Sequence, residues 1–240
     1  MHPRRLAVCS LALALTACTG GVEDRGPSTF HARGLLLAPG ETITVTFNAG
    51  STGIELRPEF TPNDAQLRIC RPSADGRGEG CLESVAWGVR TPIRGGNVEA
   101  ITLDADRAIT LGFTAEFFPL GPEIVVELPR APAAPSQTEC IENACRALFE
   151  LTPVKTGTLT ATGEFEGSSG ELAVLSGRIL ARSETATGVP YRVADIDAGA
   201  GPLEVRAQLD AGAEFAVVVG QVTGTGAGAI RNVELRMRWP

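Results

Sequence analysis

The sequence predicts an all-β protein with two tandem antiparallel β-sandwich domains. From residue 34 onward, short runs alternate apolar and polar residues with a period of two, and glycine, proline, asparagine and aspartate separate these runs. Strands with one buried and one hydrated face are typical of antiparallel sheets. A proline-rich stretch near the middle of the chain divides the strands into two groups, and each group is expected to form a sandwich.

The amino terminus resembles a bacterial lipoprotein export signal. Arg4 and Arg5 precede an uncharged apolar run at residues 6–16, and a lipobox-like tetrad, LTAC, ends at Cys18. The run is too short to span a bilayer comfortably, so residues 1–17 are predicted to be a signal peptide that is removed.

The resemblance implies that Cys18 becomes the first mature residue and carries fatty acyl chains such as palmitate. Two or three long chains anchor a protein far more firmly than one. The polar, glycine-rich residues 18–29 would then form a tether. Thr19 is not the aspartate that often retains lipoproteins in the inner membrane, so the expected location is the cell envelope, with the outer membrane favoured where there are two membranes.

The charge of the chain argues against a nucleic-acid partner. The 240 residues carry a formal net charge of −7, and loss of Arg4 and Arg5 with the signal leaves 19 basic against 28 acidic residues, a net charge of −9. Such a chain is poorly suited to neutralising phosphates. It is equally unsuited to docking on anionic lipid, which leaves the acyl chains as the membrane contact.

The alternation is clearest in three runs, at residues 42–47, 109–114 and 203–209. These runs fall into a first predicted sandwich at residues 30–129 and a second at residues 146–240. Each apolar set would face a core while its neighbours face water.

Residues 130–145 are predicted to link the two sandwiches. Three prolines between residues 129 and 135 preclude regular sheet pairing and favour a stiff, extended connector. Residues 139–148 are the one segment that could form a short helix, because Thr138 could cap it.

The cysteine content predicts disulfides. Beyond the signal peptide and the lipidated residue, four cysteines remain: Cys70, Cys81, Cys140 and Cys145. Four cysteines allow three connectivities, and an even number in an exported protein favours disulfides. We expect the local pairs Cys70–Cys81 and Cys140–Cys145. A zinc site is the rival interpretation, but the spacings lack CxxC pairs and the only mature histidine is far away in sequence.

The two halves look like diverged copies of one unit. Residues 103–113 match residues 209–219 at an offset of 106, whereas residues 50–53 match residues 167–170 at an offset of 117. The first copy therefore holds 11 extra residues between these landmarks, the same step that separates Cys70 from Cys81. We expect the disulfide loop to be an insertion at a tip of the first copy.

The second half also resembles a known family. FELTP at residues 149–153, GTLTA at residues 157–161 and LDAGAEFAV at residues 209–217 are similar to bacterial pre-peptidase C-terminal domains, which are small jelly-roll-like sandwiches. The resemblance covers about the last ninety residues, and more loosely residues 30–129. It implies jelly-roll-like topology and an accessory or adhesive role. The D-x-D strand and late tyrosine of the family are not clearly present, so its calcium-linked residues are not carried over.

The sequence shows no catalytic set. His31 follows the tether directly and is expected to be exposed and without a catalytic role. Residues 167–170 lack the second glycine of a nucleophile elbow and are expected to form a hairpin turn. Glu164 and Glu166 could act as a carboxylate pair, but nothing apolar beside them would raise one pKa, so we expect solvated strand residues.

Asp195 and Asp197 are the strongest candidates for a calcium site, because alternating acids often hold calcium. Two acids supply too few of the six or more oxygens required, and no third acid or distal glutamate follows. No metal or other cofactor is therefore predicted.

Three aromatic side chains could act as platforms for sugar rings. Trp87 is expected in the core, because Val85 and Val89 share its face of a strand. Trp239 is expected to cap a sandwich edge, and Tyr191, which follows a proline, is the ring expected to be exposed.

Together these features favour a lipid-anchored, non-catalytic surface module with a structural, adhesive or assembly role. Its expected partners are the membrane, through the anchor, and an envelope protein or a glycan. The alternative is a lipoprotein that binds a glycan or calcium. A hydrolase that uses Glu164 and Glu166 is the least favoured hypothesis.

Overall fold

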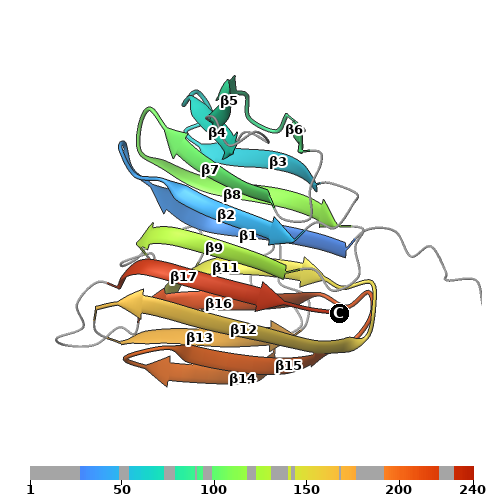
Figure 1. Cartoon of the computed structure of the whole chain (residues 1–240). Coiled ribbons are helices and arrows are strands. Elements are labelled where there is room, and N and C mark those ends of the chain that lie inside the picture. Colours follow the sequence, from blue (N-terminus) through green and yellow to red (C-terminus); the bar gives the residue numbers. More distant parts are fainter. Residues whose placement is uncertain are drawn as a thin grey trace, which may run out of the picture.

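The computed structural model describes residues 28–48, 54–72, 79–89, 91–93, 99–117, 123–130, 140–141, 144–167, 169–176, 192–221 and 230–240. Every regular element within these ranges is a β-strand. Antiparallel pairing joins the strands into two sheets that face one another across an apolar core (Figure 1). The predicted all-β antiparallel sandwich is confirmed.

The N-terminal half contributes β1 (Ser28–Leu37), β2 (Ile43–Asn48), β3 (Ile54–Thr61), β4 (Leu67–Pro72), β5 (Glu79–Val85), β6 (Thr91–Ile93), β7 (Glu99–Ala105), β8 (Ile109–Phe117) and β9 (Glu123–Arg130). The C-terminal half contributes β10 (Cys140–Ile141), β11 (Ala144–Thr152), β12 (Gly157–Glu166), β13 (Gly170–Ser176), β14 (Arg192–Gly199), β15 (Leu203–Leu209), β16 (Phe215–Gln221) and β17 (Arg231–Arg238).

Both sheets continue from one half of the chain into the other. One sheet has the order β14-β13-β16-β11-β1-β8-β3-β6, with β10 paired to β11, and the other has the order β15-β12-β17-β9-β2-β7-β4-β5. At the centre, β1 pairs with β11 and β9 pairs with β17. The two halves therefore lie side by side in one double-width sandwich and share one core (Figure 1).

The strand order repeats on either side of this centre. Read outward, β1-β8-β3-β6 corresponds to β11-β16-β13-β14, and β9-β2-β7 corresponds to β17-β12-β15. Among the described strands, the β4–β5 hairpin has no counterpart in the C-terminal half. That hairpin contains the Cys70–Cys81 disulfide, so this correspondence supports both the internal repeat and the inserted loop.

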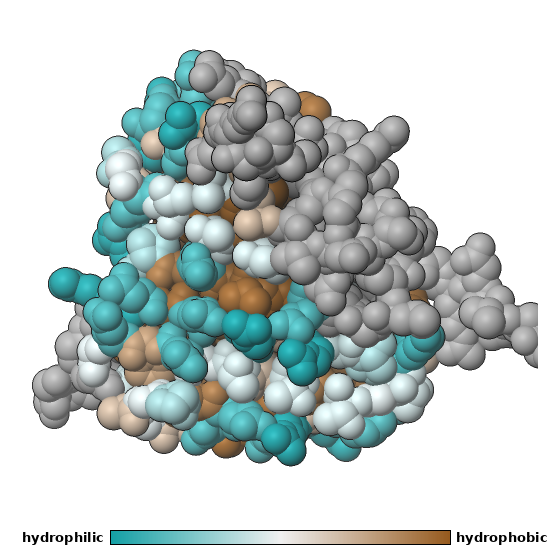
Figure 2. Space-filling view, in the orientation of Figure 1, coloured by the Kyte–Doolittle hydropathy of each residue, from teal (hydrophilic) through white to brown (hydrophobic). Residues whose placement is uncertain are grey.

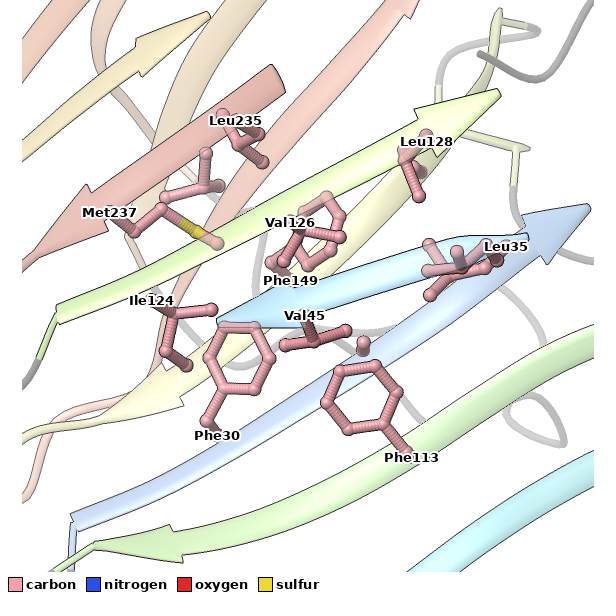
Figure 3. Close-up of a cluster of buried hydrophobic side chains, with 14 of the residues drawn as sticks. Phe30, Leu35, Val45, Phe113, Ile124, Val126, Leu128, Phe149, Leu235 and Met237 are labelled. Carbon is pink, nitrogen blue, oxygen red and sulfur yellow. The ribbon is translucent and has the colours of Figure 1, made fainter. Parts of the chain in front are cut away.

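The alternation predicted from the sequence places the core residues. Ile43, Val45 and Phe47 are buried in β2, and β15 alternates buried and exposed residues along its whole length. The core centres on Phe30, whose ring lies 5.9–6.1 Å from the ring centroids of Phe113, Phe149 and Trp239. Figure 3 shows these phenylalanines facing aliphatic side chains of the opposite sheet.

Trp239 occupies a different place from the one predicted. It does not cap an edge but is only 2% exposed and stacks on Phe30 with an interplanar angle of 11°. The reason is topological: β17 lies at the centre of its sheet, so the residue that follows it reaches the seam between the halves.

Two local predictions were wrong. Residues 140–141 and 144–148 belong to strands β10 and β11 and not to a helix, because β11 pairs with both β1 and β16 and these tertiary contacts override local helix propensity. The connection from β12 to β13 is not the hairpin turn predicted for residues 167–170, because these two strands belong to opposite sheets.

Apolar side chains also lie on the sides of the sheets that face away from the shared core. Most of the coloured surface in Figure 2 is hydrophilic or neutral, with an apolar area near the centre of the view. In the nine-stranded sheet, a second small apolar cluster occupies positions of β11, β13 and β16 that alternate with core positions. Its side chains therefore point away from the shared core. Its members are Leu148, Ala173, Leu175, Ala216 and Val218, and all five are buried.

Candidate functional site

A cavity of about 300 Å³ opens on the outward face of the nine-stranded sheet, over β1, β8 and β3. We call it the Trp87 pocket. It is lined by His31, Arg33, Gly34, Glu59, Phe60, Thr61, Trp87, Thr110, Leu111 and Gly112. The strands supply its floor and most of its walls, and the turn after β5 supplies the tryptophan.

Two glycines shape the floor of the pocket. A Cβ atom at Gly112 would lie 2.8 Å from the carbonyl oxygen of Ala32, so no side chain fits there and the sheet surface stays hollow. Gly34 has a φ of +71° within a register shift between Ala32 and Leu35. A glycine with positive φ is typical of a β-bulge, which here returns Leu35 to the core after the extra residue.

A tight turn holds Trp87 at the pocket. The Val89 amide donates to the Ala86 carbonyl at 3.2 Å, and Gly88 between them has a φ of +69°, as expected at the third position of a turn. The Gly88 amide also donates to the Pro58 carbonyl of β3 at 2.7 Å. The indole is therefore carried by a turn that is fastened to the sheet beneath it.

The prediction that Trp87 lies in the core was wrong. Its side chain is 49% exposed, and so is that of Val89. Val85 is buried, but it is the last residue of β5, so the alternation ends there and the turn begins. The Trp-Gly dipeptide was the sequence signal for this turn.

His31 also differs from the prediction, because it is a half-buried residue of the pocket wall and not a freely exposed one. Its Nδ1 atom is hydrogen-bonded to Thr114 Oγ1 at 2.6 Å. Burial, together with the charge of Arg33, lowers the pKa of His31 from 6.5 to about 4. The imidazole is therefore uncharged at neutral pH.

Arg33 joins the pocket to the seam between the halves. Its Nε atom lies 2.9 Å from Glu150 Oε2 on β11, which pairs with β1. The guanidinium that faces the pocket is thus already part of an ion pair.

The calcium candidates lie elsewhere. Asp195 and Asp197 are on β14, at the opposite end of the nine-stranded sheet from β3. Asp195 Oδ2 accepts a hydrogen bond from the Arg206 amide at 2.8 Å, and Asp197 Oδ2 accepts one from the Glu204 amide at 3.0 Å. These bonds satisfy amides of the edge strand β15 and close the sandwich edge.

No metal centre forms within the described ranges: no group of three or more histidine, cysteine, aspartate or glutamate side chains there could hold an ion. Glu164 and Glu166 are exposed on β12 in the opposite sheet from the pocket, with a register shift between them. Glu166 Oε2 accepts a hydrogen bond from Asn232 Nδ2 at 3.0 Å. The structure does not bring this pair into the Trp87 pocket.

The predicted Cys70–Cys81 disulfide is confirmed. Cys140 and Cys145 occupy directly opposite positions on β10 and β11, and their disulfide stays a prediction. Cys18 and Tyr191 lie outside the described residues. Within those residues, no helix has the length and apolar character needed to cross a bilayer.

Comparisons with known proteins assign no family. No protein-family model matches the chain, and no curated protein matches it in sequence. Among solved structures it is similar to vicilin from Corylus avellana, at 10% identity and a TM-score of 0.23, over 85% of this chain and 77% of vicilin.

It is also similar to the tandem CBM22 domains of Xyn10C from Paenibacillus barcinonensis, at 10% identity and a TM-score of 0.22, over 83% of this chain and 79% of theirs. A third similarity is to the M60 catalytic domain with two CBM51 domains of ZmpB from Clostridium perfringens, at 7% identity and a TM-score of 0.24, over 84% of this chain and 33% of that one. These TM-scores are too low to support a functional argument.

Proposed function

We propose that this chain is an exported, lipid-anchored, non-catalytic module of the cell envelope that binds a saccharide in the Trp87 pocket. The observation that carries the proposal is the half-exposed indole of Trp87 beside a hollow lined by polar side chains. Adhesion or assembly at the envelope would follow from that binding.

The chemistry of the pocket suits a sugar ring. A pyranose presents an apolar C–H face and a rim of hydroxyls. The indole offers a flat apolar surface for the first, and Glu59, Thr61 and Thr110 offer hydrogen-bonding groups for the second. The turn that carries Trp87 is fastened to Pro58, so little conformational entropy is lost when a ligand stacks on the ring.

The same residues favour binding over catalysis. Hydrolysis of a glycoside commonly uses two carboxyl groups that flank the bond, and among the described residues that line the pocket Glu59 is the one carboxylate. His31 is a poor general base for neutral pH because its pKa is about 4. We therefore assign no catalytic role to the pocket.

The binding proposal is tested with Trp87→Ala and, as a matched control, Val89→Ala. Both side chains are 49% exposed and lie in one turn, but only Trp87 lines the pocket. A glycan array on the purified chain identifies a ligand, and calorimetry measures its affinity. Loss of stacking worth about 1–3 kcal/mol would weaken binding roughly 5- to 150-fold in Trp87→Ala. Equal affinity in both variants, or no glycan bound by the wild type, would refute the proposal.

The anchor is a separate part of the proposal and rests on the sequence of residues 1–18. Growth with labelled palmitate should label the wild-type protein, and Cys18→Ser should abolish the label and release the protein from the membrane fraction. An unlabelled wild type, or unchanged partitioning of Cys18→Ser, would contradict lipidation without affecting the test of the pocket.

A further inference from the structure

We infer that the Trp87 pocket selects uncharged sugars with a vicinal diol over sugars that carry a carboxylate, and that Glu59 is the residue that sets this selectivity. The inference rests on the proposed saccharide binding and deepens it. It follows from which charged groups of the pocket are already engaged and which remain available to a ligand.

The positive charge in the pocket is committed to other groups. Among the described residues that line the pocket, Arg33 is the one that is cationic at neutral pH, and its Nε atom lies 2.9 Å from the Glu150 carboxylate. His31 is uncharged there and is bonded to Thr114. A ligand carboxylate entering the pocket would therefore meet a guanidinium whose charge Glu150 already offsets.

The negative charge of Glu59, in contrast, is available. Within the part of the chain that the structure describes, no side-chain hydrogen bond or ion pair engages this partly exposed carboxylate. A carboxylate is an acceptor with two oxygens, so it can receive hydrogen bonds from two adjacent hydroxyls of one ring. A second carboxylate, brought by an acidic sugar, would meet a like charge in a site partly shielded from water.

The register of β3 and β8 places this acceptor near two other polar groups. Glu59 lies opposite Gly112, over the hollow floor, and Thr61 lies opposite Thr110 in the neighbouring row. The two threonine hydroxyls can donate or accept. A neutral ring that stacks on Trp87 would thus meet a carboxylate and two hydroxyls, while Arg33, the cation among the described lining residues, is already paired with Glu150.

The test uses two matched series of oligosaccharides on the full-length protein. One is the neutral sugar family that the glycan array identifies, and the other is the same backbone oxidised to the uronic acid at C6. Calorimetry at low and high salt should show that the wild type binds the neutral series at least tenfold more tightly. Glu59→Gln keeps the size of the side chain and removes its charge, so it should reduce this ratio at least fivefold.

Glu164→Gln is the matched control. It removes the same charge from an exposed strand position on the opposite sheet, so it should leave the ratio unchanged. If Glu164→Gln lowers the ratio as much as Glu59→Gln does, the discrimination comes from the net charge of the molecule, and the inference is wrong.

The failures of the two proposals are distinguishable. If the wild type binds uronic acids as tightly as neutral sugars, or if Glu59→Gln leaves the ratio unchanged, the selectivity inference is overturned and saccharide binding stands. If the wild type binds neither series nor any other glycan, both proposals fall.

Discussion

Replacing Phe30 by alanine tests whether the two halves of the chain share one core. Phe30 lies in β1, at the centre of the nine-stranded sheet, and is 0% exposed. Its ring contacts Phe113 of the same half and Phe149 of the other half (Figure 3). It also stacks on Trp239 of the other half. The substitution would therefore leave a cavity at the seam and not inside either half.

The expected loss follows from the burial of the ring. Replacing a buried phenylalanine by alanine costs about 3–5 kcal/mol, because the apolar contacts are lost and the cavity collapses only partly. For a chain of about this size, 1 kcal/mol shifts the Tm by roughly 2–4 °C. We expect Phe30→Ala to lower the Tm by about 6–20 °C.

Calorimetry and circular dichroism give the measurement, and Val193→Ala gives the control. Val193 is 54% exposed on the edge strand β14, so its replacement should change stability by less than about 0.5 kcal/mol. Since the core is shared, Phe30→Ala should unfold in one transition that shifts as a whole. Two transitions of which only one moves, or a shift below about 2 °C, would refute the shared core.

Two further predictions concern pH and the disulfide. The pKa of His31 is about 4 in the folded chain, against 6.5 for the ordinary side chain. Between these two pH values the unfolded chain binds a proton that the folded chain does not. The free energy of unfolding therefore falls as the pH is lowered from about 6.5 to 4. Urea denaturation at a series of pH values measures this dependence. In His31→Gln the free energy of unfolding should change less between pH 6.5 and 4 than in the wild type. If both proteins show the same dependence on pH, the lowered pKa of His31 is contradicted. Reduction of Cys70–Cys81, which spans 11 residues, should lower the free energy of unfolding by about 2–3 kcal/mol in a Cys140→Ser, Cys145→Ser background. An unchanged denaturation midpoint would mean that the β4–β5 hairpin does not unfold with the rest.

The sequence alone predicted the strands but not their partners. Alternation in β2 or β15 reflects which side chains face the core, and that is a local property of each strand. The pairing of β1 with β11 joins residues more than a hundred positions apart, and no short pattern encodes it. The proline-rich stretch suggested separate sandwiches because it interrupts strand patterns locally, yet the strands on either side of it lie in sheets common to both halves.

The pocket was missed for a related reason, because each of its main features interrupts an alternating pattern. Trp87 follows the end of β5, and its two flanking valines imitate a continued strand. In β1, Phe30 and Ala32 face the core at even positions, but Leu35 and Leu37 do so at odd positions. This change of parity at Gly34 was the one signal of the bulge that the sequence contained.

The internal repeat explains why such a pocket exists in one half. At the offset of 106, Gly112 of β8 corresponds to Val218 of β16, and Thr110 corresponds to Ala216. Both counterparts belong to the outward apolar cluster. The equivalent sheet surface in the C-terminal half is therefore built from apolar side chains.

The backbone accounts for this difference. Between β1 and β8, the register shift at Gly34 accompanies a close approach of the Ala32 carbonyl to Gly112, which excludes any side chain at that position. The pairing of β11 with β16 runs from Arg146 to Leu151 without a shift, and a valine is accommodated at position 218. A bulge in β1 and a glycine opposite it are thus one structural feature. Restoring a side chain at the glycine would require the bulge to move, which ties the hollow under Trp87 to the fold of the central strand.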